Sequence, residues 1–67
     1  MNIQDRFIRI KTVQDRTSLS RATIYRQMQK GIFPKQVSIG AMRRGWRESE
    51  INKWMEDPVG WSSARKK

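Results

Sequence analysis

The fold of this chain is decided by residues 17–26, which are Thr17-Ser18-Leu19-Ser20-Arg21-Ala22-Thr23-Ile24-Tyr25-Arg26. The first four predict a tight turn in which Leu19 is the buried residue. Ser20 is a strong helix N-cap, because its hydroxyl can accept a hydrogen bond from an unpaired amide in the first turn. The helix that it opens is predicted to run to about Lys30. Gly31 then ends the helix by tolerating a left-handed conformation.

This predicted helix is apolar on one side and polar or cationic on the other. Ile24 and Met28 are four residues apart and therefore share the face that packs inward. The opposite face and the flanks carry Arg21, Ala22, Thr23, Tyr25, Arg26 and Gln29.

A shorter helix is predicted before the turn, from about residue 11 to residue 17, with Val13 as its main apolar anchor. Residues 7–10 are rich in β-forming types and partly alternate in polarity. They predict a brief strand or extended lead-in, with Ile8 and Ile10 turned to the same side.

A β-hairpin is predicted after the central helix. Pro34 disfavours helix at the residue before it, and residues 36–39 alternate between polar and apolar. Residues 40–45 begin and end with glycine and are predicted to form a loop, with Trp46 in the return strand. The loop carries two arginines, Arg43 and Arg44, so the hairpin is expected to have a basic tip.

The last helix is predicted over residues 48–56, with Ile51, Trp54 and Met55 on its inner face. Together with Trp46, Trp54 is expected in the core, because a small domain depends on large aromatic burial. Residues 1–57 are therefore expected to form one domain, and residues 58–67 a mobile basic tail. Trp61 either packs back onto the core or stays exposed, and the sequence leaves both open.

Composition narrows the possible functions. The 67 residues include 15 Lys and Arg against 6 Asp and Glu, a net charge of +9, and they contain neither Cys nor His. Disulfides, Cys-based zinc sites and the commonest general base are therefore excluded. No acidic pair suggests catalysis, so we expect a protein that is not an enzyme and has no metal or cofactor. No apolar run is long enough to span a bilayer, and the expected location is the cytoplasm.

Two helices joined by a tight turn, a hairpin and a third helix predict a mainly α fold, the winged helix-turn-helix. In such folds the second helix enters the major groove of DNA. From Arg16 to Arg47 the chain has eight basic residues and no acidic one, which suits a polyanion. Arginine can read guanine, hydroxyl groups suit phosphate oxygens, and a cationic hairpin suits the minor groove. The candidate DNA contacts are Ser20, Arg21, Thr23, Tyr25, Arg26, Arg43 and Arg44.

The chain also resembles the AlpA-type prophage regulators between about residues 6 and 56. The resemblance rests on the order and spacing of four blocks, which are residues 9–11, 19–26, 31–35 and 45–51, with Trp54 closing. Residues 20–24 alone are not specific, since Ser-Arg-x-Thr-Ile also occurs in MerR-type headpieces. Family members commonly have glycine at the position of Ser18, so the turn here is expected to be slightly different or mildly strained.

The resemblance implies a compact winged helix-turn-helix of the MerR and excisionase kind, with the candidate residues above in the recognition segment and the hairpin. It also implies a role in a mobile element, either in activating transcription of an integrase gene or as an excisionase that bends attachment-site DNA. The expected partners are double-stranded DNA, an integrase or RNA polymerase, and further copies of the chain on adjacent sites. The alternative of another class is a small basic RNA-binding protein.

Overall fold

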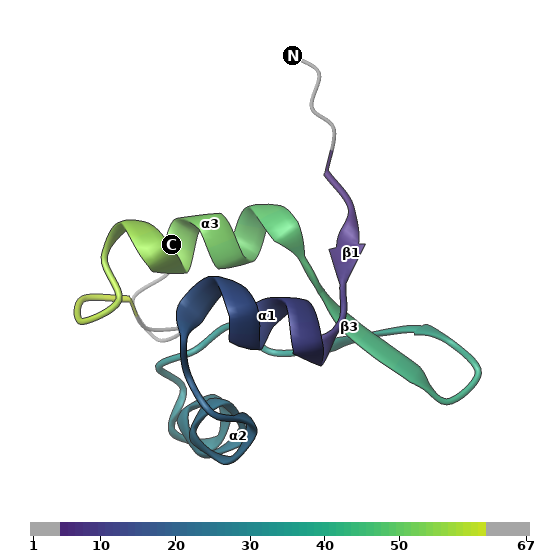
Figure 1. Ribbon diagram of the computed structural model, residues 1–67, viewed down its shortest axis with the longest axis horizontal. Coiled ribbons are helices and arrows are strands. Elements are labelled where there is room, and N and C mark those ends of the chain that lie inside the picture. Colours follow the sequence, from purple (N-terminus) through teal and green to yellow (C-terminus); the bar gives the residue numbers. More distant parts are fainter. Residues whose placement is uncertain (1–4, 62–67) are drawn as a thin grey trace.

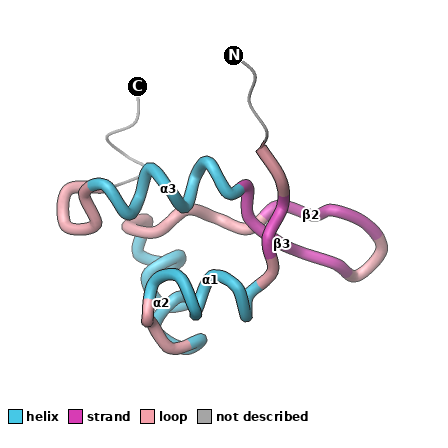
Figure 2. Tube along the Cα trace, turned by 45° about the horizontal axis from the view of Figure 1, so that its top comes forward, coloured by secondary structure: helices cyan, strands magenta, loops and turns pink. Residues whose placement is uncertain are grey.

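Two helices separated by a tight turn form the centre of the molecule. The computed structural model describes residues 5–61, in which β1 (Phe7–Ile8) leads into α1 (Ile10–Thr17) and a short turn leads into α2 (Arg21–Lys30). A hairpin of β2 (Val37–Gly40) and β3 (Arg43–Arg47) follows, and α3 (Glu48–Glu56) continues directly from it. In Figure 1, α1 lies between α2 and α3, and both Figure 1 and Figure 2 show the hairpin projecting from the side of this helical body. The predicted winged helix-turn-helix fold is confirmed.

The three strands form one antiparallel sheet in the order β1-β3-β2, so the lead-in strand pairs with the hairpin. The strand predicted over residues 7–10 is shorter than expected, because Ile10 is the first residue of α1. Arg9 is extended, with φ −96° and ψ 172°, and its carbonyl accepts the N–H of Val13 at 3.1 Å. That bond starts the helix immediately after β1.

Each element contributes to a single core. The buried side chains are Ile8, Val13, Ile24, Phe33, Trp46, Ile51 and Trp54. Leu19, predicted to be buried in the turn, is half-buried against this cluster, as is Met28. Met55 was predicted on the inner face of α3 and is instead 38% exposed. Trp54 occupies the inward position one residue earlier, and Met55 lies near the end of a helix of nine residues.

The two buried indoles fasten the segment after α2. Trp46 donates its Nε1–H to the carbonyl of Pro34 at 2.7 Å, and Trp54 donates its Nε1–H to that of Ile32 at 3.1 Å. Phe33 lies between them and meets Trp54 edge-on, with ring centroids 4.9 Å apart. The carboxyl end of α2 is therefore tied to both β3 and α3.

Trp61 packs partly buried against the core, and its N–H donates to the carbonyl of Asp57 at 2.9 Å. The sequence left open whether Trp61 packs onto the core or stays exposed, and in the structure it packs onto the core. The rest of the predicted tail, residues 62–67, lies outside the described residues.

Charged side chains clamp the amino-terminal segment to the start of α3. The carboxylate of Asp5 accepts both the N–H of Ser49 at 3.0 Å and its hydroxyl at 2.8 Å. Glu48 pairs with Arg6 at 2.9 Å and with Arg16 of α1 at 3.4 Å. Hydrogen bonds from Ser49 lower the pKa of Asp5. The hydrogen bond from Arg6 lowers the pKa of Glu48. Both carboxylates are thus part of the fold that positions α2.

Candidate nucleic-acid interface

The amino-terminal half of α2 carries a chain of hydrogen bonds on its outer side. The hydroxyl of Ser20 accepts the N–H of Thr23 at 3.2 Å, as the predicted N-cap requires, and donates to Oγ1 of Thr23 at 2.9 Å. The same Oγ1 accepts Nη2 of Arg26 at 3.3 Å. Guanidinium has five N–H donors, so this bond orients Arg26 and leaves donors for a ligand. Ser20 and Arg26 are exposed, and Thr23 is half-buried between them.

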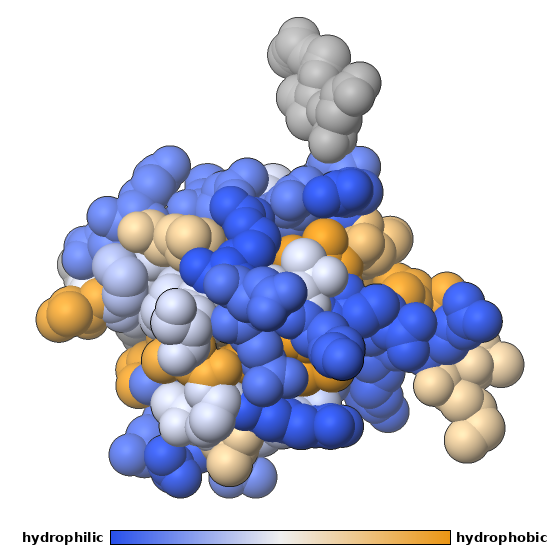
Figure 3. Space-filling view, in the orientation of Figure 1, coloured by the Kyte–Doolittle hydropathy of each residue, from blue (hydrophilic) through white to orange (hydrophobic). Residues whose placement is uncertain are grey.

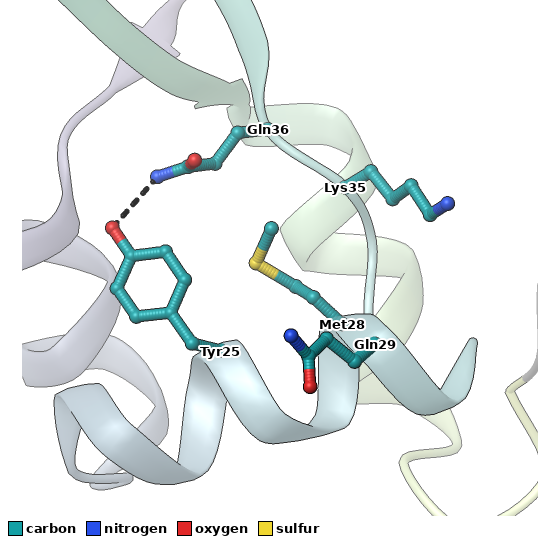
Figure 4. A pocket seen from close by; sticks show the side chains of 5 residues that line it. All are labelled: Tyr25, Met28, Gln29, Lys35 and Gln36. Atoms are coloured by element: carbon teal, nitrogen blue, oxygen red, sulfur yellow. Dashed lines mark hydrogen bonds between the residues drawn. The ribbon is translucent and has the colours of Figure 1, made fainter.

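Arg21 and Tyr25 form a second pair on the flank of α2. The guanidinium carbon of Arg21 lies 5.9 Å from the centroid of the Tyr25 ring, within the range of a cation–π contact. The hydroxyl of Tyr25 accepts Nε2 of Gln36 at 3.1 Å, across the segment that leads into β2 (Figure 4). Tyr25 therefore supports Arg21 from beneath and connects α2 to the base of the hairpin.

A hollow of about 320 Å³ opens between the outer flank of α2 and this segment. Figure 4 shows its lining side chains, from α2 on one side and from the chain before β2 on the other. They are Tyr25, Met28, Gln29, Lys35 and Gln36. The hollow borders the predicted recognition surface, and the exposed Lys35 stands at its edge with its amine directed away from it (Figure 4).

The hairpin formed by β2 and β3, here called the wing, differs at its tip from the prediction. Gly40 pairs with Arg43, so the loop is only Ala41 and Met42, and both arginines belong to β3. The expected loop over residues 40–45 is wrong, and the tip itself is uncharged. Met42 occupies it with φ 58° and 98% exposure.

Gly45 was expected to end a flexible loop, but glycine is required at this position because β1 passes close to it. A Cβ at this position would lie 2.7 Å from the carbonyl oxygen of Ile8. The glycine therefore permits close approach of β1 to β3 and does not serve turn flexibility. Successive side chains on a strand point to opposite faces, so Arg43 and Arg44, both exposed, extend from the two faces of the wing.

Exposed cations cover α2 and the wing. All seven basic residues from residue 21 to residue 47 are exposed, and they are Arg21, Arg26, Lys30, Lys35, Arg43, Arg44 and Arg47. Within residues 5–61 both ion pairs use Glu48, with Arg6 and Arg16 as partners. None of the seven forms an ion pair within these residues, although Arg47 lies close enough to Asp5 to help lower the pKa of that carboxyl. Figure 3 shows hydrophilic side chains in a broad band across the body and along the wing, with an apolar end at the far right.

The structure thus places five of the seven predicted contacts on α2 and its N-cap, in two groups, and the other two on the wing. Sequence reasoning missed Gln36, Lys35 and Met42. No local spacing links Tyr25 to a residue eleven positions later. Met42 is recognised as the tip only once the strand pairing shows that the loop has two residues.

Residues 5–61 contain no group of three acidic, His or Cys side chains placed to hold a metal ion. None of the helices described has the length and apolar character to cross a membrane.

Comparisons with known proteins agree with this architecture. A family model described as "Prophage CP4-57 regulatory protein (AlpA)" matches residues 6–64. An uncharacterised protein, ORF88 of Enterobacteria phage P4, is 46% identical over 52 residues, which are 78% of this chain and 59% of the phage protein. The chain therefore spans less than two thirds of that relative.

A second relative is the DNA-binding transcriptional activator AlpA of Escherichia coli strain K12. It is 34% identical over 56 residues, which cover 75% of this chain and 80% of that protein. No solved structure matches the chain. The family match spans nearly the whole fold described above, from Arg6 at the clamp through α2, the wing and α3. The chain belongs to the AlpA family of prophage regulatory proteins.

Proposed function

We propose that this protein binds double-stranded DNA sequence-specifically and regulates a prophage or other mobile element. The observation that carries the proposal is the outer side of α2, where Ser20, Thr23 and Arg26 are joined by hydrogen bonds above the buried Ile24. A rigid helix with pre-oriented donors is what major-groove recognition requires. The printed name of the E. coli relative, a DNA-binding transcriptional activator, supports the same conclusion.

On this proposal each part of the surface has its own task. The exposed cations draw the protein to the duplex through long-range attraction. The guanidinium groups of Arg21 and Arg26 then meet base edges, since arginine pairs bidentately with guanine. The hydroxyl groups of Ser20, Thr23 and Tyr25 would contact phosphates, and the wing would carry Arg43 and Arg44 to the neighbouring minor groove.

The regulated event, on this proposal, is expression of an integrase gene, with RNA polymerase as the protein partner. The alternative is an excisionase that bends attachment-site DNA and recruits the integrase. A DNA-binding module this small covers about 600–1,000 Å² of its own surface. Both roles therefore gain specificity from several copies on adjacent sites. Either role places the protein in the cytoplasm, on the nucleoid.

Footprinting on the mobile element that encodes the chain tests the proposal. The promoter of the integrase gene and the attachment site are probed in one experiment, with a mixed-sequence duplex as competitor. Protection at the promoter alone supports the regulator, and phased protection across the attachment site supports the excisionase. Uniform protection with no preferred sequence contradicts sequence-specific binding.

Competition between duplex DNA and a structured RNA distinguishes a DNA-binding protein from the alternative, a small basic RNA-binding protein. Sequence-specific RNA binding usually stacks bases on exposed aromatic rings. Here Phe33, Trp46 and Trp54 are buried, and the exposed ring of Phe7 is already in contact with Arg47, so we expect the duplex to displace the RNA. Preferential retention of the RNA would favour the RNA-binding alternative.

A further inference from the structure

We propose that Met42 is an apolar wedge that enters the minor groove and partly unstacks one base step. This inference rests on the proposed function, because it assigns a contact within the same DNA complex. The starting observation is that Met42 stands at the outermost point of the wing and is 98% exposed. Methionine is one of the side chains that DNA-bending proteins insert between base steps from the minor groove.

Within residues 5–61 no contact accounts for methionine at this position. Its φ of 58° lies in the left-handed region, where glycine and asparagine are the usual residues. The side chain is almost fully exposed, so packing within the described chain does not offset the backbone strain. Backbone strain that no packing contact offsets suggests that the residue is kept for a contact with another molecule.

The surroundings of Met42 favour DNA over a protein as the occupant. Arg43 and Arg44 follow it directly on β3, and they extend from opposite faces of the wing. A minor groove has a phosphate backbone along each wall, so each arginine can contact the phosphates of one wall. A protein interface of standard size buries about 800 Å² per partner. Ala41 and Met42 alone, next to two cations, offer far less apolar area.

The dimensions agree with this arrangement. A strand rises about 3.3 Å per residue, so the two arginines begin roughly 3 and 7 Å behind the tip. The minor groove is about 7.5 Å deep. When Met42 reaches the base edges, the backbone of Arg44 is therefore near the top of the groove walls, and that of Arg43 lies between the walls, roughly 3 Å from the base edges. An irregularity in the strand register between Ser38 and Gly40, just behind the tip, is of the kind that increases local twist and re-aims a hairpin.

The test uses short duplexes that the wild-type chain selects from a randomised pool. They carry 2-aminopurine at successive steps beneath the wing and a fluorophore pair at their ends. We expect wild-type binding to raise 2-aminopurine emission at one step and to shorten the end-to-end distance. Met42→Leu keeps an apolar wedge and should preserve both signals. Met42→Ala should lose both and bind about tenfold more weakly, because the apolar burial that is lost outweighs the unstacking cost that is saved.

Val59→Ala is the matched control, because Val59 is 97% exposed and lies away from the wing. It should leave affinity and both signals unchanged. Circular dichroism should show the same fold for every variant, since neither side chain is packed in the core.

Two results would overturn the wedge alone. One is wild-type binding without a rise in 2-aminopurine emission, or with a rise that Met42→Ala retains. The other is a Met42→Ala variant impaired only in loading a second copy on tandem sites, which would show a contact between proteins. A wild-type chain with no preference for the selected duplex would overturn the proposed function as well.

Discussion

Ser18 holds the turn between α1 and α2 in a left-handed conformation, with φ 64° and ψ 17°. Its N–H donates to the carbonyl of Gln14 at 2.8 Å, and the next N–H, of Leu19, donates to Oγ1 of Thr17 at 3.3 Å. A residue with a Cβ in this region costs about 1–2 kcal/mol. The mild strain expected at this position from the sequence is therefore present, and local hydrogen bonds hold the turn against it.

Replacing Ser18 with glycine should stabilise the fold. Relief of the left-handed strain exceeds the added entropy of the unfolded glycine, which is about 0.5–1 kcal/mol, so the net gain is up to about 1 kcal/mol. For a domain of this size that raises Tm by roughly 4–8 °C, which thermal unfolding followed by circular dichroism will measure. Ser18→Ala keeps the Cβ and should show no such gain. A lower Tm for Ser18→Gly would contradict the strain.

Arg26 offers the sharpest residue-level test of DNA recognition. Arg26→Ala should cost roughly 1–3 kcal/mol on a selected duplex and relax base preference at one position, if the guanidinium pairs bidentately with a base. Arg26→Lys should fail almost as much on that duplex, because lysine keeps the charge without the planar fork. Lys30→Ala, at the other end of α2, is the control for charge alone. An equal loss for Arg26→Ala on selected and random DNA would show that Arg26 contacts only phosphate.

At the scale of elements, the helices could be predicted because their signals are local. Ser20 caps α2 and Gly31 ends it at φ 77°, and both effects act within a few residues along the chain. The pairing of β1 with β3 could not be predicted, because it joins residues about 40 positions apart. The same holds for the cap that Asp5 supplies to α3. Such contacts depend on the assembled core.

The candidate site shows the same division. Helical spacing was sufficient to place Arg21 and Arg26 on the exposed side of α2. It gave no sign that the hydroxyl of Tyr25 is engaged by Gln36, because their proximity depends on where Pro34 and the buried indoles direct the chain. A glycine at the end of the expected loop was interpreted as a turn residue, whereas it accommodates a neighbouring strand.

The Tyr25–Gln36 bond makes a testable link between two elements. If it sets the angle of the wing relative to α2, Tyr25→Phe and Gln36→Leu should weaken DNA binding to a similar extent. Their combination should then be no worse than either alone, since both remove one bond worth about 0.5–1.5 kcal/mol. Equilibrium titration of the two single variants and the double variant measures this coupling. Additive losses would mean that the two side chains affect binding independently and that their hydrogen bond does not set the angle of the wing.

The clamp between the amino-terminal segment and α3 predicts acid sensitivity. The folded-state pKa values of Asp5 and Glu48 lie below their ordinary values of 3.8 and 4.5. Between the ordinary and lowered values the unfolded chain binds more protons than the folded chain, so stability falls as the pH falls. The contribution is complete above about pH 5 and is lost as the pH drops through the lowered values. Thermal unfolding from neutral pH down to pH 2 should show this decline.

The variant Glu48→Gln distinguishes the loss of stability caused by protonation of this carboxylate from acid unfolding caused by other groups. The variant should lower Tm at neutral pH, where the ion pairs with Arg6 and Arg16 are lost, and should flatten the decline below about pH 5. Glu50→Gln, in the same first turn of α3, is the matched control. A pH profile of Glu48→Gln parallel to that of the wild type would show that this carboxylate does not couple to folding.

For the whole molecule, the decisive property is the separation of charge along the chain. All six acidic residues lie outside the segment from Arg16 to Arg47, which contains α2 and the wing. Two of the six, Asp5 and Glu48, are engaged in the clamp. The net charge of +9 is therefore concentrated on the surface proposed to meet DNA. The acidic side chains of Asp5 and Glu48 lie outside that surface and stabilise the fold.

This separation predicts the salt dependence of binding. If about five phosphates are neutralised, log affinity should fall with log salt concentration at a slope near −4 to −5. Replacing Arg43 and Arg44 together with alanine should weaken binding and reduce that slope by about 2, because each phosphate contact contributes about 0.9. Replacing Arg9 and Lys11, which lie outside the candidate surface, gives a control with the same loss of net charge. If both double variants change the slope equally, net charge alone governs affinity, and the wing does not contact the duplex.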